Sequence, residues 1–312
     1  MRFSNPHIRD SHRTFKHFLL WKLGYYDDPA PPLSPPSHFT YPASPQPFIK
    51  ERPSAVWIGH STYLIEVDGL SILTDPVWDT HCSPVRLKAF RRTSEPAIPF
   101  ADLPPIDLVL ISHNHYDHLD LKTVSAIHKF HPQVEWVIPS RLSGWFHRRG
   151  IRNVKEIGWW ESSKMKNCKI TAVPAQHFSG RSLWDKNRTH WNGYVLESPS
   201  KKRLYFTGDT GYNPYDFKAI GEKWPHMDLS LIPIGTYVPQ RFMKPVHVGP
   251  EEAVRIHQDV KSRLSLGMHW NTFRLSDEPQ DRPPYDLFLE MRKKRLPFAA
   301  FLPIEIGAYV NW

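Results

Sequence analysis

The chain has 312 residues, 40% of them hydrophobic, and a formal net charge of +9 with histidine neutral, which excludes an intrinsically disordered protein and favours anionic partners such as phosphate esters, nucleic acid or an acidic membrane surface. Its two cysteines, Cys82 and Cys168, are too few for a disulfide framework and favour a reducing compartment. No apolar run reaches the roughly 18 residues that span a bilayer, so we expect a cytoplasmic protein, either free or peripherally bound to a membrane.

Residues 1–53 form an N-terminal arm rich in aromatic residues and proline. Within it, Phe15–Tyr26 (FKHFLLWKLGYY) is typical of a short amphipathic helix, and residues 29–53 are typical of an extended segment. Two interpretations are open: an ordered wrap over the domain surface, or a contact with a membrane or with a second subunit in a homodimer. We place a domain boundary here and assign residues 54–312 to one folded domain.

The first part of this domain begins with short strands and then alternates strands with helices. Asp68-Gly69 predicts a hairpin turn between two of the strands. Residues 84–105 form a basic, proline-containing loop, and the apolar run over 106–112 predicts a buried strand. The strands are expected over 55–58, 63–67, 71–73, 106–112 and 133–139, and the helices over 120–130 and 140–149.

The second part repeats this order. Strands are expected over 169–174, 192–197, 203–207, 229–234 and 265–268. A helix is expected over 250–263, because Pro250 suits its first turn and Glu251 and Glu252 face the positive end of its dipole. His257 falls on the apolar stripe of this helix, which predicts a buried, hydrogen-bonded histidine. The repeat indicates an α/β protein with two similar halves packed sheet to sheet and helices outside.

The clearest chemical signal is Ser112–His118 (SHNHYDH), which places four candidate metal ligands directly after a buried strand. His113 and His115 are two residues apart, so in an extended chain they project to the same side. Asp117 and His118 follow as the chain turns towards a helix, where they can face a second ion. Imidazole and carboxylate ligands without cysteine suit an open, catalytic site for zinc, and also iron or manganese. A solvated histidine-rich loop is the alternative.

Further ligands are expected at the ends of other strands. His177 follows the strand over 169–174, and His269 ends the strand over 265–268. Asp209 lies in the turn TGDTG, whose glycines allow a close backbone approach, and a carboxylate there could bridge two ions. Each residue alone is as consistent with a structural role, but their order along the chain favours a shared site.

The chain resembles the metallo-β-lactamase superfamily, and within it the branch of N-acylphosphatidylethanolamine-hydrolysing phospholipase D and its bacterial relatives. The resemblance covers about residues 55–275. Its motifs are HNHYDH at 113–118, PAQH at 174–177, TGDTGY at 207–212, MHW at 268–270, WIGHST at 57–62, LTDP at 73–76, WWE at 159–161, IPIG at 232–235 and HVGPEEAVRIH at 247–257.

The resemblance implies an αββα four-layer sandwich with two Zn²⁺ ions at one edge between the sheets. The implied ligands are His113, His115 and His177 for one zinc, Asp117, His118 and His269 for the other, and Asp209 with a hydroxide between them. Asp75 would orient a ligand imidazole, and His60 and His247 would border the substrate. The residues expected to be catalytic are Asp117, His118 and Asp209.

The resemblance further implies a dinuclear zinc hydrolase of phospholipase D type, a phosphodiesterase in which metal-bound hydroxide attacks N-acylphosphatidylethanolamine-like glycerophospholipids. A metal-dependent lactone or ester hydrolase of the same fold is one alternative. A nucleic-acid phosphodiesterase is another, supported by the basic charge. However, the sequence contains no RNA-binding module, so no specific nucleic-acid partner is expected. An inactive metal-binding scaffold is disfavoured by the complete set of seven ligands.

Overall fold

Two seven-stranded sheets face each other in the structure, a computed structural model that describes residues 2–8, 19–21, 23–25, 32–182 and 184–312. The strands of the first sheet are β1 (Ser54–Gly59), β2 (Thr62–Val67), β3 (Leu70–Thr74), β4 (Leu108–Leu110), β5 (Glu135–Pro139), β6 (Val154–Ile157) and β14 (Tyr309–Asn311). Their spatial order is β14-β1-β2-β3-β4-β5-β6. The predicted hairpin turn joins β2 to β3, with Asp68 and Gly69 both at positive φ.

The second sheet is built from the later part of the chain. Its strands are β7 (Ser162–Met165), β8 (Cys168–Val173), β9 (Gly193–Glu197), β10 (Arg203–Phe206), β11 (Met227–Pro233), β12 (Ser262–Met268) and β13 (Phe301–Leu302). Their spatial order is β13-β12-β11-β10-β9-β8-β7.

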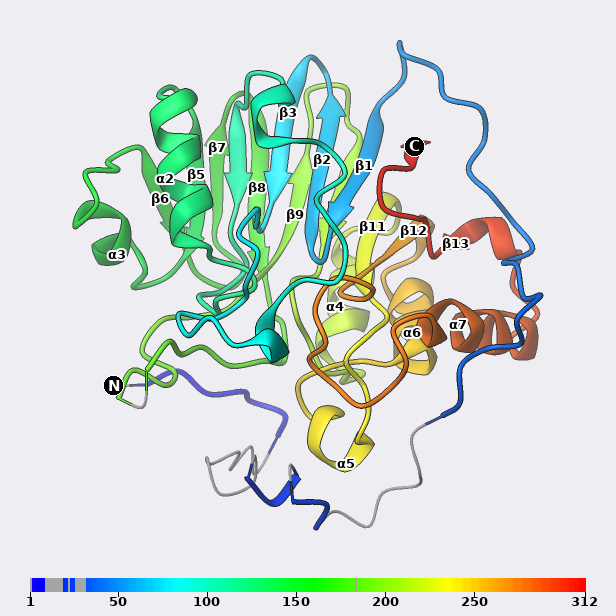
Figure 1. Cartoon of the computed structure of the whole chain (residues 1–312). Coiled ribbons are helices and arrows are strands. Elements are labelled where there is room, and N and C mark those ends of the chain that lie inside the picture. The colour runs from blue at the N-terminus through cyan, green and yellow to red at the C-terminus, as the bar shows by residue number, and fades with distance from the viewer. Residues whose placement is uncertain (1, 9–18, 22, 26–31, 183) are drawn as a thin grey trace.

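Helices cover the outer face of each sheet (Figure 1). The helices beside the first sheet are α2 (Leu121–Phe130) and α3 (Ser143–His147), and those beside the second are α4 (Asp216–Lys223), α6 (Pro250–Asp259) and α7 (Arg282–Lys293). A short helix, α5 (Gln240–Met243), lies below the second sheet in this view. The predicted αββα four-layer sandwich is therefore confirmed.

Strand β1 shows how the sequence builds these layers. Its residues point alternately to the two faces of the sheet. Ala55 and Trp57 belong to the core cluster that includes residues of both sheets, whereas Val56 and Ile58 pack in a separate cluster with the apolar residues of α2 and α3. All four side chains are buried, because both faces of the sheet are covered.

Strand direction places the candidate site at one edge of the sandwich. β3, β4, β5 and β6 are parallel to one another, and so are β10, β11, β12 and β13. The carboxyl ends of parallel strands lie at the same edge of a sheet. Segments that follow four of these ends carry Asp75 after β3, His113 after β4, Asp209 after β10 and His269 after β12.

Two predicted helices are shorter in the structure. The helix expected over 250–263 ends at Asp259, because the chain turns at Lys261 with φ of 53° and Ser262 then pairs with Met227 in the parallel sheet. The helix expected over 140–149 spans only Ser143–His147. Strands β6, β7, β13 and β14 are short and were not expected from the sequence. Helices α4 and α7 were also not expected, although both are amphipathic.

The N-terminal arm contacts the domain at several of its described residues. Half of the predicted helix over 15–26 lies outside the described residues, and residues 19–21 are helical. Trp21 is 8% exposed, stacks on Phe242 with 5.1 Å between ring centroids and donates its indole N–H to Asp277. Further along, the Tyr41 hydroxyl donates to the carbonyl of Phe301. The domain boundary at residue 53 and the homodimer contact stay predictions. Across the described ranges, no helix is both long and apolar enough to traverse a bilayer.

Candidate metal centre

Three histidines form the first cluster: His113, His115 and His177. His113 Nε2 lies 2.8 Å from His115 Nδ1, and His177 Nε2 lies 3.2 Å from the same nitrogen. His113 and His115 follow β4 and His177 follows β8, so two parts of the chain more than 60 residues apart supply the cluster. Each residue offers one ring nitrogen within 4.8 Å of the others, which is a spacing that one metal ion can occupy.

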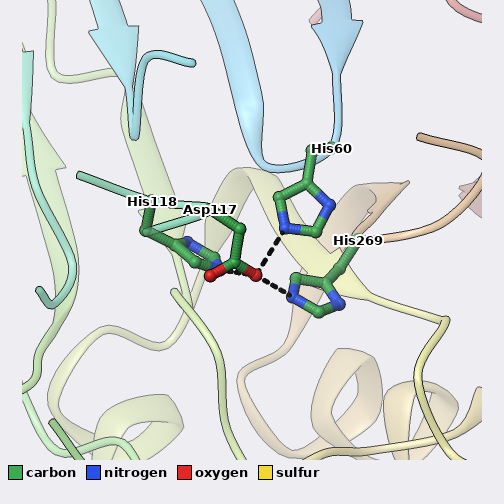
Figure 2. Close-up of side chains that lie close together, drawn as sticks. All are labelled: His60, Asp117, His118 and His269. Carbon is green, nitrogen blue, oxygen red and sulfur yellow. Dashed lines mark hydrogen bonds and ion pairs between the residues drawn. The ribbon is translucent and has the colours of Figure 1, made fainter. Parts of the chain in front are cut away.

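The second cluster contains His60, Asp117, His118 and His269 (Figure 2). Asp117 Oδ2 lies 3.1 Å from His60 Nε2, 3.5 Å from His118 Nε2 and 3.7 Å from His269 Nε2. Figure 2 shows the three rings converging on this carboxylate. The structure thus brings Asp117, His118 and His269 together as predicted and adds His60, which the sequence placed at the border of the substrate.

Asp209 lies between the two clusters. Its Oδ2 is 3.0 Å from His269 Nε2 and 3.2 Å from His118 Nε2 in the second cluster, and 3.8 Å from His177 Nε2 in the first. The glycine before it makes this position accessible. Gly208 has φ of +60°, and a Cβ there would lie 2.6 Å from the Cβ of Ser112. The close backbone approach expected for this turn is therefore present.

Asp75 supports both clusters from outside. The carboxylate accepts a hydrogen bond of 2.6 Å from His118 Nδ1 and bonds of 2.7 Å and 2.5 Å from the backbone N–H and hydroxyl of Ser112. The same Ser112 oxygen accepts from His113 Nδ1 at 2.8 Å. Asp75 therefore orients His118 directly and His113 through Ser112, as outer partners of ligand histidines usually do.

Several supporting residues were not predicted from the sequence. The Thr236 hydroxyl lies 3.1 Å from His269 Nδ1, and His177 Nδ1 donates to the carbonyl of Val246 at 2.9 Å. Arg181 donates to the carbonyls of Asn114 and Leu119 at 2.9 and 2.7 Å, which holds the loop that carries the HNHYDH motif. Among the residues that support the ligands, Ser112 alone had a sequence signal, because it lies directly before the HNHYDH motif.

The backbone at the site is held in unusual conformations. His60, Asp75 and His269 have φ of 52°, 32° and 63°, in the left-handed region that residues other than glycine seldom adopt. Each of them is the first residue after a strand. Hydrogen bonds fix two of these turns to each other, because His269 N–H donates to the carbonyl of His60 at 3.0 Å. Such strain is typical of functional sites.

The first cluster is electrically neutral. Burial lowers the pKa of His115 to about 4 and lowers those of His113 and His177 well below the usual range. The neighbouring histidines lower the pKa of His113 further. Because a metal needs the neutral imidazole, three neutral histidines are suited to hold a cation without first losing protons.

The second cluster is charged. Burial opposes the charged form of His118, but the carboxylates of Asp209, Asp117 and Asp75 outweigh burial and raise its pKa well above the usual range. In the same way, burial of His269 is outweighed by Asp209 and Asp117, which raise its pKa to about 9. The pKa values of Asp117 and Asp209 fall well below the usual range, because these histidines outweigh their burial.

The donor set fits metal ions. His118 Nε2, His269 Nε2 and Asp209 Oδ1 are buried and make no hydrogen bond among the described residues, although both nitrogens lie within ion-pair distance of Asp209 Oδ2. Buried polar atoms are costly unless they are paired. The two nitrogens belong to the second cluster, and the oxygen belongs to Asp209, which lies between the two clusters. Imidazole and carboxylate donors without cysteine match a catalytic site for zinc or a similar ion.

The remaining predicted residues lie as follows. His247 Nδ1 is 3.7 Å from Asp209 Oδ2, and its side chain is 13% exposed, so it borders the cluster on the solvent side. His60 is 2% exposed and lies deeper. His257 is remote from the cluster: it is buried and its Nδ1 lies 2.8 Å from the Ser265 hydroxyl, as expected for a structural histidine.

Comparison with known proteins agrees with this geometry. Residues 71–270 match the model of the beta-lactamase superfamily domain. An N-acyl-phosphatidylethanolamine-hydrolyzing phospholipase D of Caenorhabditis elegans is 38% identical over 264 residues, which are 81% of this chain and 74% of the relative. The mitochondrial enzyme of the same description from Saccharomyces cerevisiae is 35% identical over 243 residues, 76% of this chain and 50% of the relative.

Solved structures share the fold. A metallo hydrolase from the archaeon Ignicoccus hospitalis superposes with a TM-score of 0.62 at 21% identity, covering 83% of this chain and 98% of that one. The matched region contains every residue of the two clusters except His60, which precedes it. The chain therefore belongs to the metallo-β-lactamase superfamily, in the branch that includes the N-acylphosphatidylethanolamine-hydrolysing phospholipases D and other metal-dependent hydrolases.

Proposed function

We propose that this metal-dependent hydrolase holds two Zn²⁺ ions and cleaves a phosphodiester bond in N-acylphosphatidylethanolamine-like glycerophospholipids. The observation that carries the proposal is the pair of donor clusters on either side of Asp209. The activity named for the relatives from Caenorhabditis elegans and Saccharomyces cerevisiae supports the substrate class.

The residues would divide the ions between them. The proposed ligands are His113, His115 and His177 for one ion, Asp117, His118 and His269 for the other, and Asp209 for both. When bound, a pair of divalent ions lowers the pKa of water and stabilises negative charge on a phosphoryl group. Asp117, His118 and Asp209 are the proposed catalytic residues, because His118 Nε2 lies 3.5 Å from Asp117 Oδ2 and 3.2 Å from Asp209 Oδ2, so the three side chains meet at one point.

Residues around the ligands would fix the geometry. His60 Nε2 donates to Asp117 Oδ2, and burial lowers the pKa of His60 to about 3, so this ring is a neutral hydrogen-bond donor. Asp75 holds His118 in one ring orientation. The His247 side chain is 13% exposed and would contact a substrate oxygen from the solvent side.

Exposed apolar side chains support a lipid substrate. Val85 and Leu87 are 55% and 56% exposed, in a basic loop that also carries Lys88. Trp184 is 76% exposed, in the loop between β8 and β9 that also carries His177. Apolar and basic side chains together suit the surface of an anionic membrane, where tryptophan prefers the interface. We therefore propose peripheral contact with a membrane through these loops.

A substrate comparison tests the proposal. The zinc-loaded protein is incubated with vesicles containing N-acylphosphatidylethanolamine, and released phosphatidate is measured. We expect turnover by the wild type and by His38→Ala, an exposed histidine outside the site, and its loss in His115→Ala. Simple phosphodiesters, lactones, carboxylic esters and polynucleotides are assayed in parallel.

The outcomes separate the alternatives. No turnover of any phosphodiester by protein that holds two ions would refute the proposed reaction. Turnover of only lactones or esters would indicate the ester hydrolase. Turnover of polynucleotides with binding that weakens steeply with salt would indicate the nucleic-acid phosphodiesterase.

A further inference from the structure

The segment Arg2–Ile8 lies against the loop that carries His177 (Figure 1). This loop, residues 174–192, joins β8 to β9. The backbone N–H of Phe3 donates to the carbonyl of Asn187 at 2.9 Å, and the Phe3 ring meets His190 edge-on with 4.2 Å between centroids. Two chain segments that are far apart in the sequence, with Asn5 and His177 172 residues apart, are therefore joined beside the first cluster.

Asn5 makes the contact nearest the cluster. Its Nδ2 donates to the carbonyl of His177 at 2.8 Å, and its Oδ1 accepts from the indole N–H of Trp191 at 3.2 Å. The same indole N–H also lies 2.9 Å from the carbonyl of Ala175. One amide side chain thus links residues near both ends of the loop.

The far end of the segment is also anchored. The His7 ring stacks on Tyr215 with 4.7 Å between centroids, and His7 Nε2 lies 3.4 Å from Asp216 Oδ1. Asn5 therefore lies between two fixed points, Phe3 and His7. A side chain held in this way loses little additional conformational freedom when it forms hydrogen bonds.

His177 is held at two places by unrelated parts of the chain. Its ring is oriented by Val246, whose carbonyl accepts from Nδ1, while its backbone carbonyl accepts from Asn5. Strand β8 ends at Val173, and beyond it the backbone of Gln176 pairs with Gly211 in an isolated bridge. Asn5 therefore holds the backbone at the residue that directly follows this last pairing. A ring can be correctly oriented and still be misplaced if its backbone moves.

We infer that Asn5 is a positioning residue, which fixes the backbone of His177 and so places Nε2 within the first cluster. The inference rests on the proposed role of His177 as a metal ligand. It assigns to the arm a task within the metal centre, in addition to the surface roles considered above.

The test compares retention of zinc by full-length variants. Asn5→Ala removes both hydrogen bonds, and Asn5→Asp is nearly isosteric but removes the donor to His177. Ser4→Ala, at the exposed neighbouring residue, is the matched control. His177→Ala and His269→Ala identify which of the two ions belongs to each cluster. Ions per chain are measured by elemental analysis after dialysis against chelators of increasing affinity.

One of the two ions is identified as the ion that His177→Ala loses. We expect both Asn5 variants to bind this ion about 5- to 10-fold more weakly than Ser4→Ala does, which is the equivalent of one hydrogen bond. The other ion should be unaffected. With Co²⁺ in place of zinc, the visible spectrum of the same site should change. The urea midpoint of the metal-free protein should stay close to that of Ser4→Ala.

Two results would overturn the inference. Equal retention by the Asn5 variants and Ser4→Ala would show that the contact does not position His177. Equal weakening of both ions with a lower urea midpoint would show a general structural role. If His177→Ala itself keeps both ions, His177 is not a metal ligand and the proposed ligand set is wrong. This result differs from the two above, which concern Asn5 alone.

Discussion

The imidazole of His118 and the carboxylate of Asp75 are joined by a 2.6 Å contact between Nδ1 and Oδ2, and both side chains are fully buried. The neutral amide in Asp75→Asn cannot provide the same charged acceptor to His118 and to Ser112. We expect the variant to bind zinc 10- to 100-fold more weakly, roughly the usual effect of removing such a partner. Competition with a chelator measures the change.

Asp79→Asn is the control for that experiment, because Asp79 lies four residues later and pairs instead with Arg86 and Lys122. It should bind zinc like the wild type. Unchanged affinity in Asp75→Asn would mean that the carboxylate does not orient a ligand.

Removing single ligands should separate the two ions. Because His113 and His269 belong to different clusters, His113→Ala and His269→Ala should each retain about one ion per chain, and Asp209→Asn should weaken both. Elemental analysis of protein purified from zinc-containing buffer gives the count. A wild type that holds one ion, or a His113→Ala variant that still holds two, would contradict this division of the ligands.

Two glycines provide a matched pair for testing how the Asp209 turn is built. Gly69 and Gly208 both have positive φ, of 76° and 60°, but a Cβ at Gly69 meets nothing within 4 Å, whereas one at Gly208 collides with Ser112. Gly69→Ala should therefore cost only the backbone penalty of about 1 kcal/mol in free energy of unfolding. Gly208→Ala should cost more and also weaken zinc binding, since Asp209 must shift. Equal losses in urea denaturation and equal zinc affinities would show that the close approach is not required.

His257 should make stability depend on pH independently of the metal centre. Burial lowers its pKa to about 4, against an ordinary value of 6.5. Between these two pKa values the unfolded chain binds a proton at His257 that the folded chain excludes. The free energy of unfolding is therefore unaffected by His257 above about pH 6.5 and decreases as the pH falls towards 4. The expected loss is roughly 2–3 kcal/mol.

Asparagine does not titrate, so His257→Asn lacks this pH dependence. Between pH 7 and about pH 4.5 its free energy of unfolding should fall less than that of the wild type, by most of these roughly 2–3 kcal/mol. Urea denaturation with chelator present measures it, because protonation of the metal ligands then affects every variant alike. His38→Asn should keep the slope of the wild type. If the slope of His257→Asn also equals that of the wild type, the buried histidine is not the titrating group.

Local patterns predicted the strands that lead into the site but not the short or late elements of the fold. Strand β4 lies within the apolar run over 106–112, and β10 lies within the strand expected over 203–207. The Asp68-Gly69 pair predicted the turn between β2 and β3. By contrast, β14 has three residues and exists because it pairs with β1, from the opposite end of the domain. The helix over 250–259 was recognised, but its end depended on the pairing of Ser262 with Met227.

The sequence alone determined which donor atoms are available, because ligand chemistry depends on residue type and on spacing such as that of His113 and His115. It indicated that Asp209 could bridge two ions but gave none of the distances. It could not determine that Thr236 and Val246 orient two imidazoles, or that Asn5 reaches the backbone of His177. Those relationships join residues far apart in the chain, and only the packing of the two sheets and the segments around them brings such residues within hydrogen-bond distance.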